Sequence, residues 1–233
     1  NVGIDAFIEK KLPLFAETAP DATCVASIAG ETLEEFICLA ERLSGNPTVK
    51  AIELNISCPN VAKGGMHFGA DRNASIELVK ECRKVSSVPI WVKVTPATTD
   101  PVSVALACGE AGADAVVATN TVPATKIDIR KCRPVLGNVF GGLSGPAIFP
   151  ISLRIAYMIH KAMPELTLIG CGGVDCGEKA VQFILAGCSA VEIGCATFRN
   201  PGTVLEVKSF VEKYMEEMGF ETIEDFRGKA VIF

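Results

Sequence analysis

Six short apolar runs alternate with longer stretches of helical period, and this alternation constrains the fold of the chain more than any other feature. Each run is almost continuously hydrophobic, which is typical of parallel strands covered on both faces. The predicted strands are residues 23–30, 51–57, 90–96, 115–120, 167–173 and 190–196. The predicted helices include residues 31–44, 75–85 and 177–186. Such a repeat predicts a parallel α/β sheet.

Polar and small residues gather where the predicted strands end. Barrels of the (β/α)8 type and open doubly wound sheets both place their active sites at the carboxyl ends of strands. No GxGxxG motif opens a helix after the first strand, which disfavours a dinucleotide-binding sheet. We expect a (β/α)8 TIM barrel that forms one domain over residues 1–233. A barrel needs eight strands and the sequence shows six, so we expect the first two strands to lie ahead of Asn1.

Composition and charge narrow the classes of partner. The chain has 233 residues, 49% of them hydrophobic, and a net charge of -5, so it lacks the basic excess that binds nucleic acid or an anionic membrane. No apolar run is long enough for a membrane span. Small molecules and proteins remain as partners.

The cysteines and histidines indicate the compartment and argue against a metal site. Ten cysteines are spread along the chain without a CxxC pair, and seven of them fall in apolar patterns, where a free thiol packs as a small hydrophobe. We therefore expect a reducing, cytoplasmic setting. The chain has two histidines and no HxH or HExxH motif, so we expect no histidine-based metal site.

Cys58 is the strongest candidate for a catalytic residue. It follows the strand at residues 51–57 in a polar loop, between Asn55 and Asn60, and a glycine-rich segment comes next. One interpretation is a buried structural thiol; the other is a base or nucleophile at a strand end. The two asparagines suit a planar amide or carboxylate ligand, or serve only as turn residues.

Small-residue loops predict a phosphate site. They occupy residues 141–146, 170–173 and 194–197, and the last two close the final pair of predicted strands. Phosphate groups in α/β barrels commonly bind there, on backbone N–H groups. Tight turns are the simpler interpretation of any one of these loops.

Lys93 stands in an otherwise apolar strand, where a lysine buried without a partner is very costly. Its ammonium therefore either reaches solvent or faces a ligand, and we favour a ligand that carries or develops negative charge. Asn120 and Thr121 end the next strand in a similar manner.

The strings ELNISCPN, GGMHFG, VKVTP, ATNT, GGLSGPAI, GCGGV and IGCATF resemble the dihydroorotate dehydrogenase family, in its NAD-dependent branch with a cysteine base. The resemblance covers almost all of the chain. It implies a (β/α)8 barrel that holds FMN and oxidises dihydroorotate to orotate in the cytoplasm. It also implies a separate electron-transfer subunit with FAD and a 2Fe-2S cluster, in a homodimer or heterotetramer.

The resemblance also assigns roles to individual residues. Cys58 would be the base. The substrate would contact Asn55, Asn60, Asn120 and Thr121. The flavin cofactor would contact Ser27, Asn55, Lys93, Thr119, Gly145, Gly172, Gly173, Gly194 and Cys195. At Ser27 the family often has asparagine, and Cys195 replaces a common threonine.

Other functions fit parts of the same pattern. The flavin half of dihydropyrimidine dehydrogenase, which acts on uracil or thymine, resembles the chain at ATNTV but differs after SCP. A non-redox barrel enzyme acting on a sugar phosphate, with Cys58 structural, is a second alternative. A catalytically inactive interaction subunit is a third.

Overall fold

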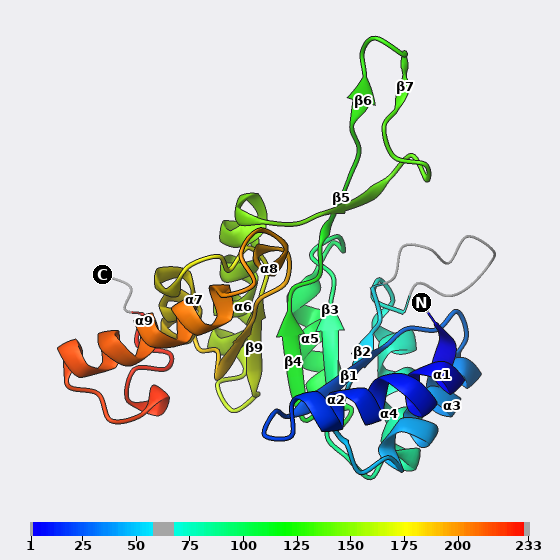
Figure 1. Cartoon of the computed structure of the whole chain (residues 1–233), viewed down its shortest axis with the longest axis horizontal. Coiled ribbons are helices and arrows are strands. Elements are labelled where there is room, and N and C mark those ends of the chain that lie inside the picture. The colour runs from blue at the N-terminus through cyan, green and yellow to red at the C-terminus, as the bar shows by residue number, and fades with distance from the viewer. Residues whose placement is uncertain (1, 58–67, 231–233) are drawn as a thin grey trace. The chain divides into compact units, whose positions relative to one another are not determined.

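The computed structural model contains the predicted alternation of strands and helices (Figure 1). It describes residues 2–57 and 68–230. In these residues the main sheet has the strand order β1-β2-β3-β4-β9-β10. Its strands are β1 (Cys24–Ile28), β2 (Val49–Asn55), β3 (Ile90–Val94), β4 (Ala115–Ala118), β9 (Leu168–Cys171) and β10 (Ala190–Glu192). The prediction of six strands is therefore confirmed, although most of them are shorter than the apolar runs suggest.

The chain forms two compact units. The first comprises Asn1–Val94 and Ser103–Val116, and the second comprises Thr95–Val102 and Val117–Phe233. Strand β4 contributes residues to both units. The single domain expected over residues 1–233 stays a prediction.

The first unit is built on three parallel strands. β1 pairs with β2 and β2 with β3, and this register places Ser27 opposite Glu53 and Asn55 opposite Lys93. Helices α3 (Leu33–Ser44) and α4 (Arg72–Val85) pack on each other and against these strands. Its helical segments are α1 (Gly3–Ala6), a π-helical turn (Phe7–Lys11), α2 (Leu12–Thr18), α3 (Leu33–Ser44), α4 (Arg72–Val85) and most of α5 (Pro101–Glu110).

Side-chain caps define where the two main helices of this unit begin. Thr32 accepts a hydrogen bond from the backbone N–H of Glu35, and Asp71 accepts two from the first turn of α4. Such caps satisfy N–H groups that have no partner within the helix. The predicted helix starts at residues 31 and 75 are therefore displaced by a few residues in the structure.

The second unit contains the parallel pair β9 and β10. Helix α6 (Phe149–Ala162) packs on β9 and on α7 (Gly177–Leu185), and α7 packs on α9 (Thr203–Met218). Phe226 is fully buried and packs with side chains of α7 and α9, and its ring is stacked on that of Phe220 with 5.2 Å between the ring centroids. The helical segments are a 3-10 turn (Pro146–Ile148), α6 (Phe149–Ala162), α7 (Gly177–Leu185), α8 (Ala196–Arg199), α9 (Thr203–Met218) and a second 3-10 turn (Ile223–Asp225).

An antiparallel ribbon of residues 122–143 extends from the rest of the second unit (Figure 1). β5 (Val122–Ala124) pairs with β8 (Gly141–Leu143), and β6 (Ile127–Asp128) pairs with β7 (Arg133–Pro134). The prediction that residues 141–146 form a loop is thus wrong for the first three of them. The ribbon exposes large apolar side chains: Ile127, Ile129, Val135, Leu136, Val139, Phe140 and Leu143.

The cysteines of the described residues are free thiols. Cys82, Cys108 and Cys188 are buried, and burial raises the pKa of each to about 12. These three pack as the apolar pattern predicts. Cys38 does not, because it lies on the exposed face of α3. Within the described ranges, no helix has the length and apolar character that a membrane span requires.

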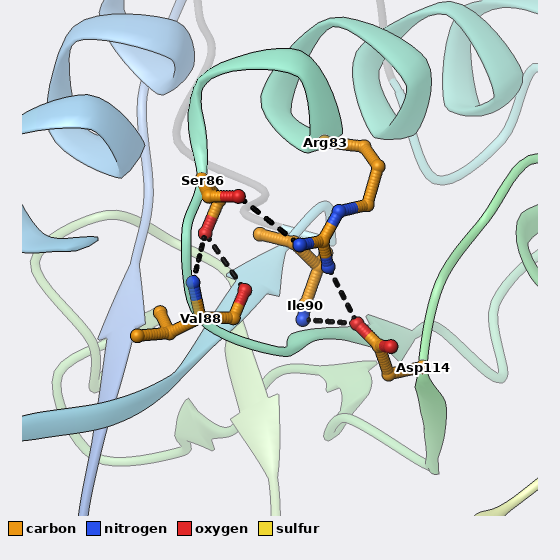
Figure 2. A network of polar contacts seen from close by, with 5 residues as sticks. All are labelled: Arg83, Ser86, Val88, Ile90 and Asp114. Carbon is orange, nitrogen blue, oxygen red and sulfur yellow. Dashed lines mark hydrogen bonds and ion pairs between the residues drawn. The ribbon is translucent and has the colours of Figure 1, made fainter.

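A polar network ties the amino-terminal ends of β3 and β4 to helix α4 (Figure 2). One oxygen of Asp114 accepts hydrogen bonds from the Arg83 guanidinium and from the backbone N–H of Ile90, both at 2.7 Å. Arg83 also donates to the carbonyl of Ser86 at 3.0 Å, and the Ser86 hydroxyl donates to the carbonyl of Val88 at 2.8 Å. The network therefore fixes the turn that connects α4 to β3.

We predict that Asp114→Ala lowers the free energy of unfolding by about 1–3 kcal/mol, because the N–H of the buried Ile90 loses its acceptor. Glu110→Ala is the matched control, since the ion pair of Glu110 with Arg72, at 3.6 Å, is exposed. Exposed pairs of this kind contribute about 0–1 kcal/mol. Urea unfolding of both variants measures the difference, and equal small losses would contradict the assignment.

Candidate active site

The carboxyl ends of β1, β2 and β3 bring together three of the predicted site residues. Ser27, Asn55 and Lys93 lie on adjacent strands, and the register places Asn55 beside Lys93. Parallel pairing is what makes strand ends meet in this way. The structure thus brings Ser27, Asn55 and Lys93 to one end of the sheet in the first unit, and their roles stay predictions.

Lys93 does not stand alone in its apolar strand. The side chain is 17% exposed, and its Nζ lies 3.5 Å from Oε2 of Glu53, whose side chain is 5% exposed. The other carboxylate oxygen of Glu53 accepts a hydrogen bond from the Ser27 hydroxyl at 2.7 Å. Glu53 was not among the predicted site residues, although a carboxylate inside an apolar run needs a partner for the same physical reason as Lys93.

Asn55 organises the backbone at the carboxyl end of β2. Its side-chain oxygen accepts a hydrogen bond from the backbone N–H of Ser57 at 3.3 Å, and the Ser57 hydroxyl donates to the carbonyl of Lys93 at 3.0 Å. These bonds attach the end of β2 to β3. Cys58 and Asn60, the predicted base and one predicted substrate ligand, lie outside the described residues.

Thr119, Asn120 and Thr121 follow β4 in the second unit. Thr119 is 1% exposed, and its hydroxyl lies 2.8 Å from the hydroxyl of Ser152 on α6. Its backbone N–H donates to the carbonyl of Cys171 at 2.6 Å. The contacts of Thr119 are therefore with the protein, and its predicted flavin contact stays a prediction.

Asn120 is held in a defined orientation. Its side-chain oxygen accepts a hydrogen bond from the backbone N–H of Thr121 at 2.8 Å, which directs the amide nitrogen the other way. Both residues are half-buried. This geometry suits the predicted contact with a planar ring that carries hydrogen-bond acceptors.

A cavity of about 240 Å³ in the second unit brings together three of the predicted cofactor-binding residues, Gly145, Gly173 and Cys195. Gly145 and Gly173 have positive φ, at 94° and 78°, a conformation that favours glycine. A Cβ on Gly173 would lie 2.8 Å from the Gly145 carbonyl oxygen, so glycine also permits the two loops to touch.

The charge of this cavity comes from residues that the sequence analysis missed. Arg199, the last residue of α8, lines it together with Asp175. Lys179 donates to Asp175 at 2.7 Å, and this hydrogen bond holds the pKa of Asp175 below its usual value. Because Lys179 offsets the carboxylate, Arg199 gives the cavity a positive charge that suits an anion.

Gly172 and Gly194 lie in the two loops that were predicted to hold phosphate, but their surroundings differ. Gly172 has a φ of 119°, and a Cβ there would collide with the side chain of Ser152. A Cβ on Gly194 would meet nothing within 4 Å. Gly172 is therefore required by packing, whereas Gly194 leaves open space above the backbone.

Parallel strands that alternate with helices and carry polar residues at their carboxyl ends are typical of α/β enzymes. The sequence model of the dihydroorotate dehydrogenase family matches residues 1–215. The chain belongs to that family, whose members are oxidoreductases that oxidise dihydroorotate in pyrimidine biosynthesis.

Individual relatives agree with the family match. The catalytic subunit of dihydroorotate dehydrogenase B (NAD(+)) from Geobacter sulfurreducens is 43% identical over 228 residues, which are 98% of this chain and 74% of that protein. The corresponding subunit from Geotalea daltonii is 43% identical over 232 residues, 100% of this chain and 75% of that protein.

A solved structure shows the same fold. The dihydroorotate dehydrogenase of Eimeria tenella, crystallised with ferulenol, superposes with a TM-score of 0.74 at 19% sequence identity. The superposition covers 95% of this chain and 66% of that one.

We predict that Gly172→Ala lowers the free energy of unfolding by about 1–3 kcal/mol, because alanine is strained at positive φ and its Cβ overlaps Ser152. Gly194→Ala, at the matching strand end, should leave stability within about 0.5 kcal/mol of the parent. Guanidinium unfolding of the two variants compares them directly. Equal stability of the pair would show that the close packing at Gly172 is absent in solution.

Proposed function

We propose that this chain oxidises dihydroorotate to orotate, with FMN as the hydride acceptor and Cys58 as the base. The observation that carries the proposal is the 43% identity, over 98% of the chain, to a protein named as the catalytic subunit of dihydroorotate dehydrogenase B. The same name is carried by the relative from Geotalea daltonii, and this name favours dihydroorotate oxidation over the dihydropyrimidine and sugar-phosphate alternatives.

Two groups of described residues, one in each unit, support FMN as the cofactor. The glycine-lined cavity of about 240 Å³ has room for a phosphate, which glycine backbone commonly binds, and Arg199 supplies a cation. Its proposed phosphate ligands are Gly172, Gly173, Gly194, Cys195 and Arg199. The proposed contacts of the flavin itself are Ser27, Asn55, Lys93, Thr119 and Gly145. When bound, FMN accepts the hydride that leaves dihydroorotate.

The residues of the chain handle the proton and orient the substrate. A proton leaves the carbon next to a ring carbonyl, which requires a base within hydrogen-bond reach. Cys58 is proposed for this role, and Asn55, Asn60, Asn120 and Thr121 are proposed to hold the ring. Lys93 would supply positive charge beside the flavin ring, which gains negative charge when it is reduced.

The proposal extends to fold, partners and compartment. The six strands are proposed to belong to a (β/α)8 barrel, as the likeness to the Eimeria enzyme supports. The word "catalytic subunit" in the names of the relatives supports a second subunit, proposed to carry FAD and a 2Fe-2S cluster and to pass electrons to NAD. A homodimer or heterotetramer in the cytoplasm is the assembly proposed.

We predict that Cys58→Ala in the full-length protein retains FMN but slows flavin reduction by dihydroorotate about 10²-fold or more, the usual contribution of a general base. Cys58→Ser should keep part of the rate with its pH profile moved upward, because a hydroxyl is a weaker acid than a thiol, whose ordinary pKa is about 8.5. Anaerobic stopped-flow bleaching of the flavin measures both variants.

The matched control is Cys38→Ala, which removes an exposed thiol on α3 and should leave the rate unchanged. A near-normal rate in Cys58→Ala at neutral pH would remove the assignment of the base. A full-length protein that purifies without flavin and binds none would overturn the proposed function itself.

A further inference from the structure

Glu53 carries a carboxylate at a position in the sheet that is almost inaccessible to solvent. It lies within β2 between Ile52 and Leu54, which are both fully buried, and is itself 4% exposed. Burial of a charged group is costly unless the group is paired and hydrogen-bonded. The position of Glu53 therefore depends on the partners that the neighbouring strands supply.

The partners come from both sides of β2. Ser27 on β1 donates to one oxygen of Glu53 at 2.7 Å, and Lys93 on β3 places its ammonium 3.5 Å from the other oxygen. One carboxylate thus links three strands at their carboxyl ends. Because each oxygen faces a different strand, the side chain has a defined orientation.

We propose that Glu53 is a positioning residue that holds the ammonium of Lys93 in one place and offsets part of its charge, and thereby sets the reduction potential of the bound flavin. The inference rests on the proposed function, in which the flavin ring lies beside Lys93. Glu53 itself is not assigned a contact with substrate or cofactor.

Two physical arguments support this role. A lysine has a flexible four-carbon stem, so without a fixed partner its ammonium would occupy several positions. Buried pairs also specify geometry more reliably than they add stability. Glu53 therefore gives Lys93 a defined place at the strand end.

The second argument concerns charge. A hydride brings two electrons and one proton, so its transfer leaves one additional negative charge on the ring system. Lys93 alone would favour that charge strongly, whereas Lys93 paired with Glu53 favours it less. Loss of the carboxylate should make the bound flavin easier to reduce, and loss of the lysine should make it harder to reduce.

The test begins with Glu53→Gln, which keeps the size of the side chain and removes its charge. The Ser27 hydroxyl can donate or accept, so the amide can still bond to it while its carbonyl oxygen faces Lys93. We expect the equilibrium between reduced and oxidised bound flavin to shift at least tenfold toward the reduced form, which for a two-electron couple is about 30 mV. Potentiometric titration of the full-length holoprotein measures this shift.

Glu34→Gln is the matched control. It removes the same charge from an exposed position on α3 in the same unit and should leave the potential unchanged. If Glu53 had only a structural role, Glu53→Gln would lower the stability of the protein but leave the reduction potential of the bound flavin unchanged. That result, with FMN bound normally, would overturn the inference and leave the proposed function intact.

A double-variant cycle tests whether Glu53 acts through Lys93. Lys93→Met should lower the potential, and a carboxyl buried without its cation takes up a proton. Adding Glu53→Gln to Lys93→Met should therefore change the potential no further, whereas additive shifts would overturn the inference. The double variant also leaves no uncompensated buried charge, so it remains informative if Glu53→Gln alone fails to fold.

The apoprotein provides a reading that needs no flavin. In Lys93→Met the folded protein should hold a proton on Glu53 above the ordinary glutamate pKa of about 4.3, so stability falls as pH rises beyond that value. The Lys93→Met/Glu53→Gln double variant should lack this fall. Parallel pH dependence of the two apoproteins would show that Glu53 and Lys93 are not coupled.

Discussion

The parallel register of β2 with its two neighbours is the constraint on which the polar site of the first unit depends. It places Ser27 opposite Glu53 and Asn55 opposite Lys93, so the charged and amide groups meet at one end of the sheet. A shift of one residue would turn each side chain of the shifted strand to the other face. The buried neighbours Ile52, Leu54, Ile90 and Val92 oppose such a shift, because they would lose their places in the core. Core packing and site geometry are therefore fixed by the same pairing.

Much of the architecture could be predicted because covered parallel strands leave a strong hydrophobic signal. All six runs became strands, and the polar residues at their ends include Lys93 and Asn55. The ribbon at residues 122–143 could not be predicted in this way. Its strands have two or three residues each, and they carry glycine, proline and charged residues in place of an alternating apolar pattern. Strands that short leave no periodicity to detect.

Two site residues, Glu53 and Arg199, could not be predicted from the sequence for a different reason. The significance of Glu53 comes from what lies across from it on β1 and β3, and that depends on register. Arg199 lines the glycine-lined cavity because α8 begins at Ala196, within the segment 194–197 that was predicted to be a loop, and places Arg199 at its end. Tertiary placement of this kind leaves no local pattern. For Cys38 the helical periodicity predicted burial, but the thiol lies at the exposed edge of the apolar stripe of α3.

The ribbon has a consequence for how opening motions are distributed through the second unit. A two-stranded ribbon has marginal stability by itself, and this one leaves Ile129 86% and Phe140 67% exposed. Its amide hydrogens should therefore exchange with solvent through local opening of low free energy. The amide hydrogens of β9, whose Leu168 is fully buried, should exchange only through an opening of much higher free energy. The same backbone thus contains a segment that samples open states often and a sheet that seldom does.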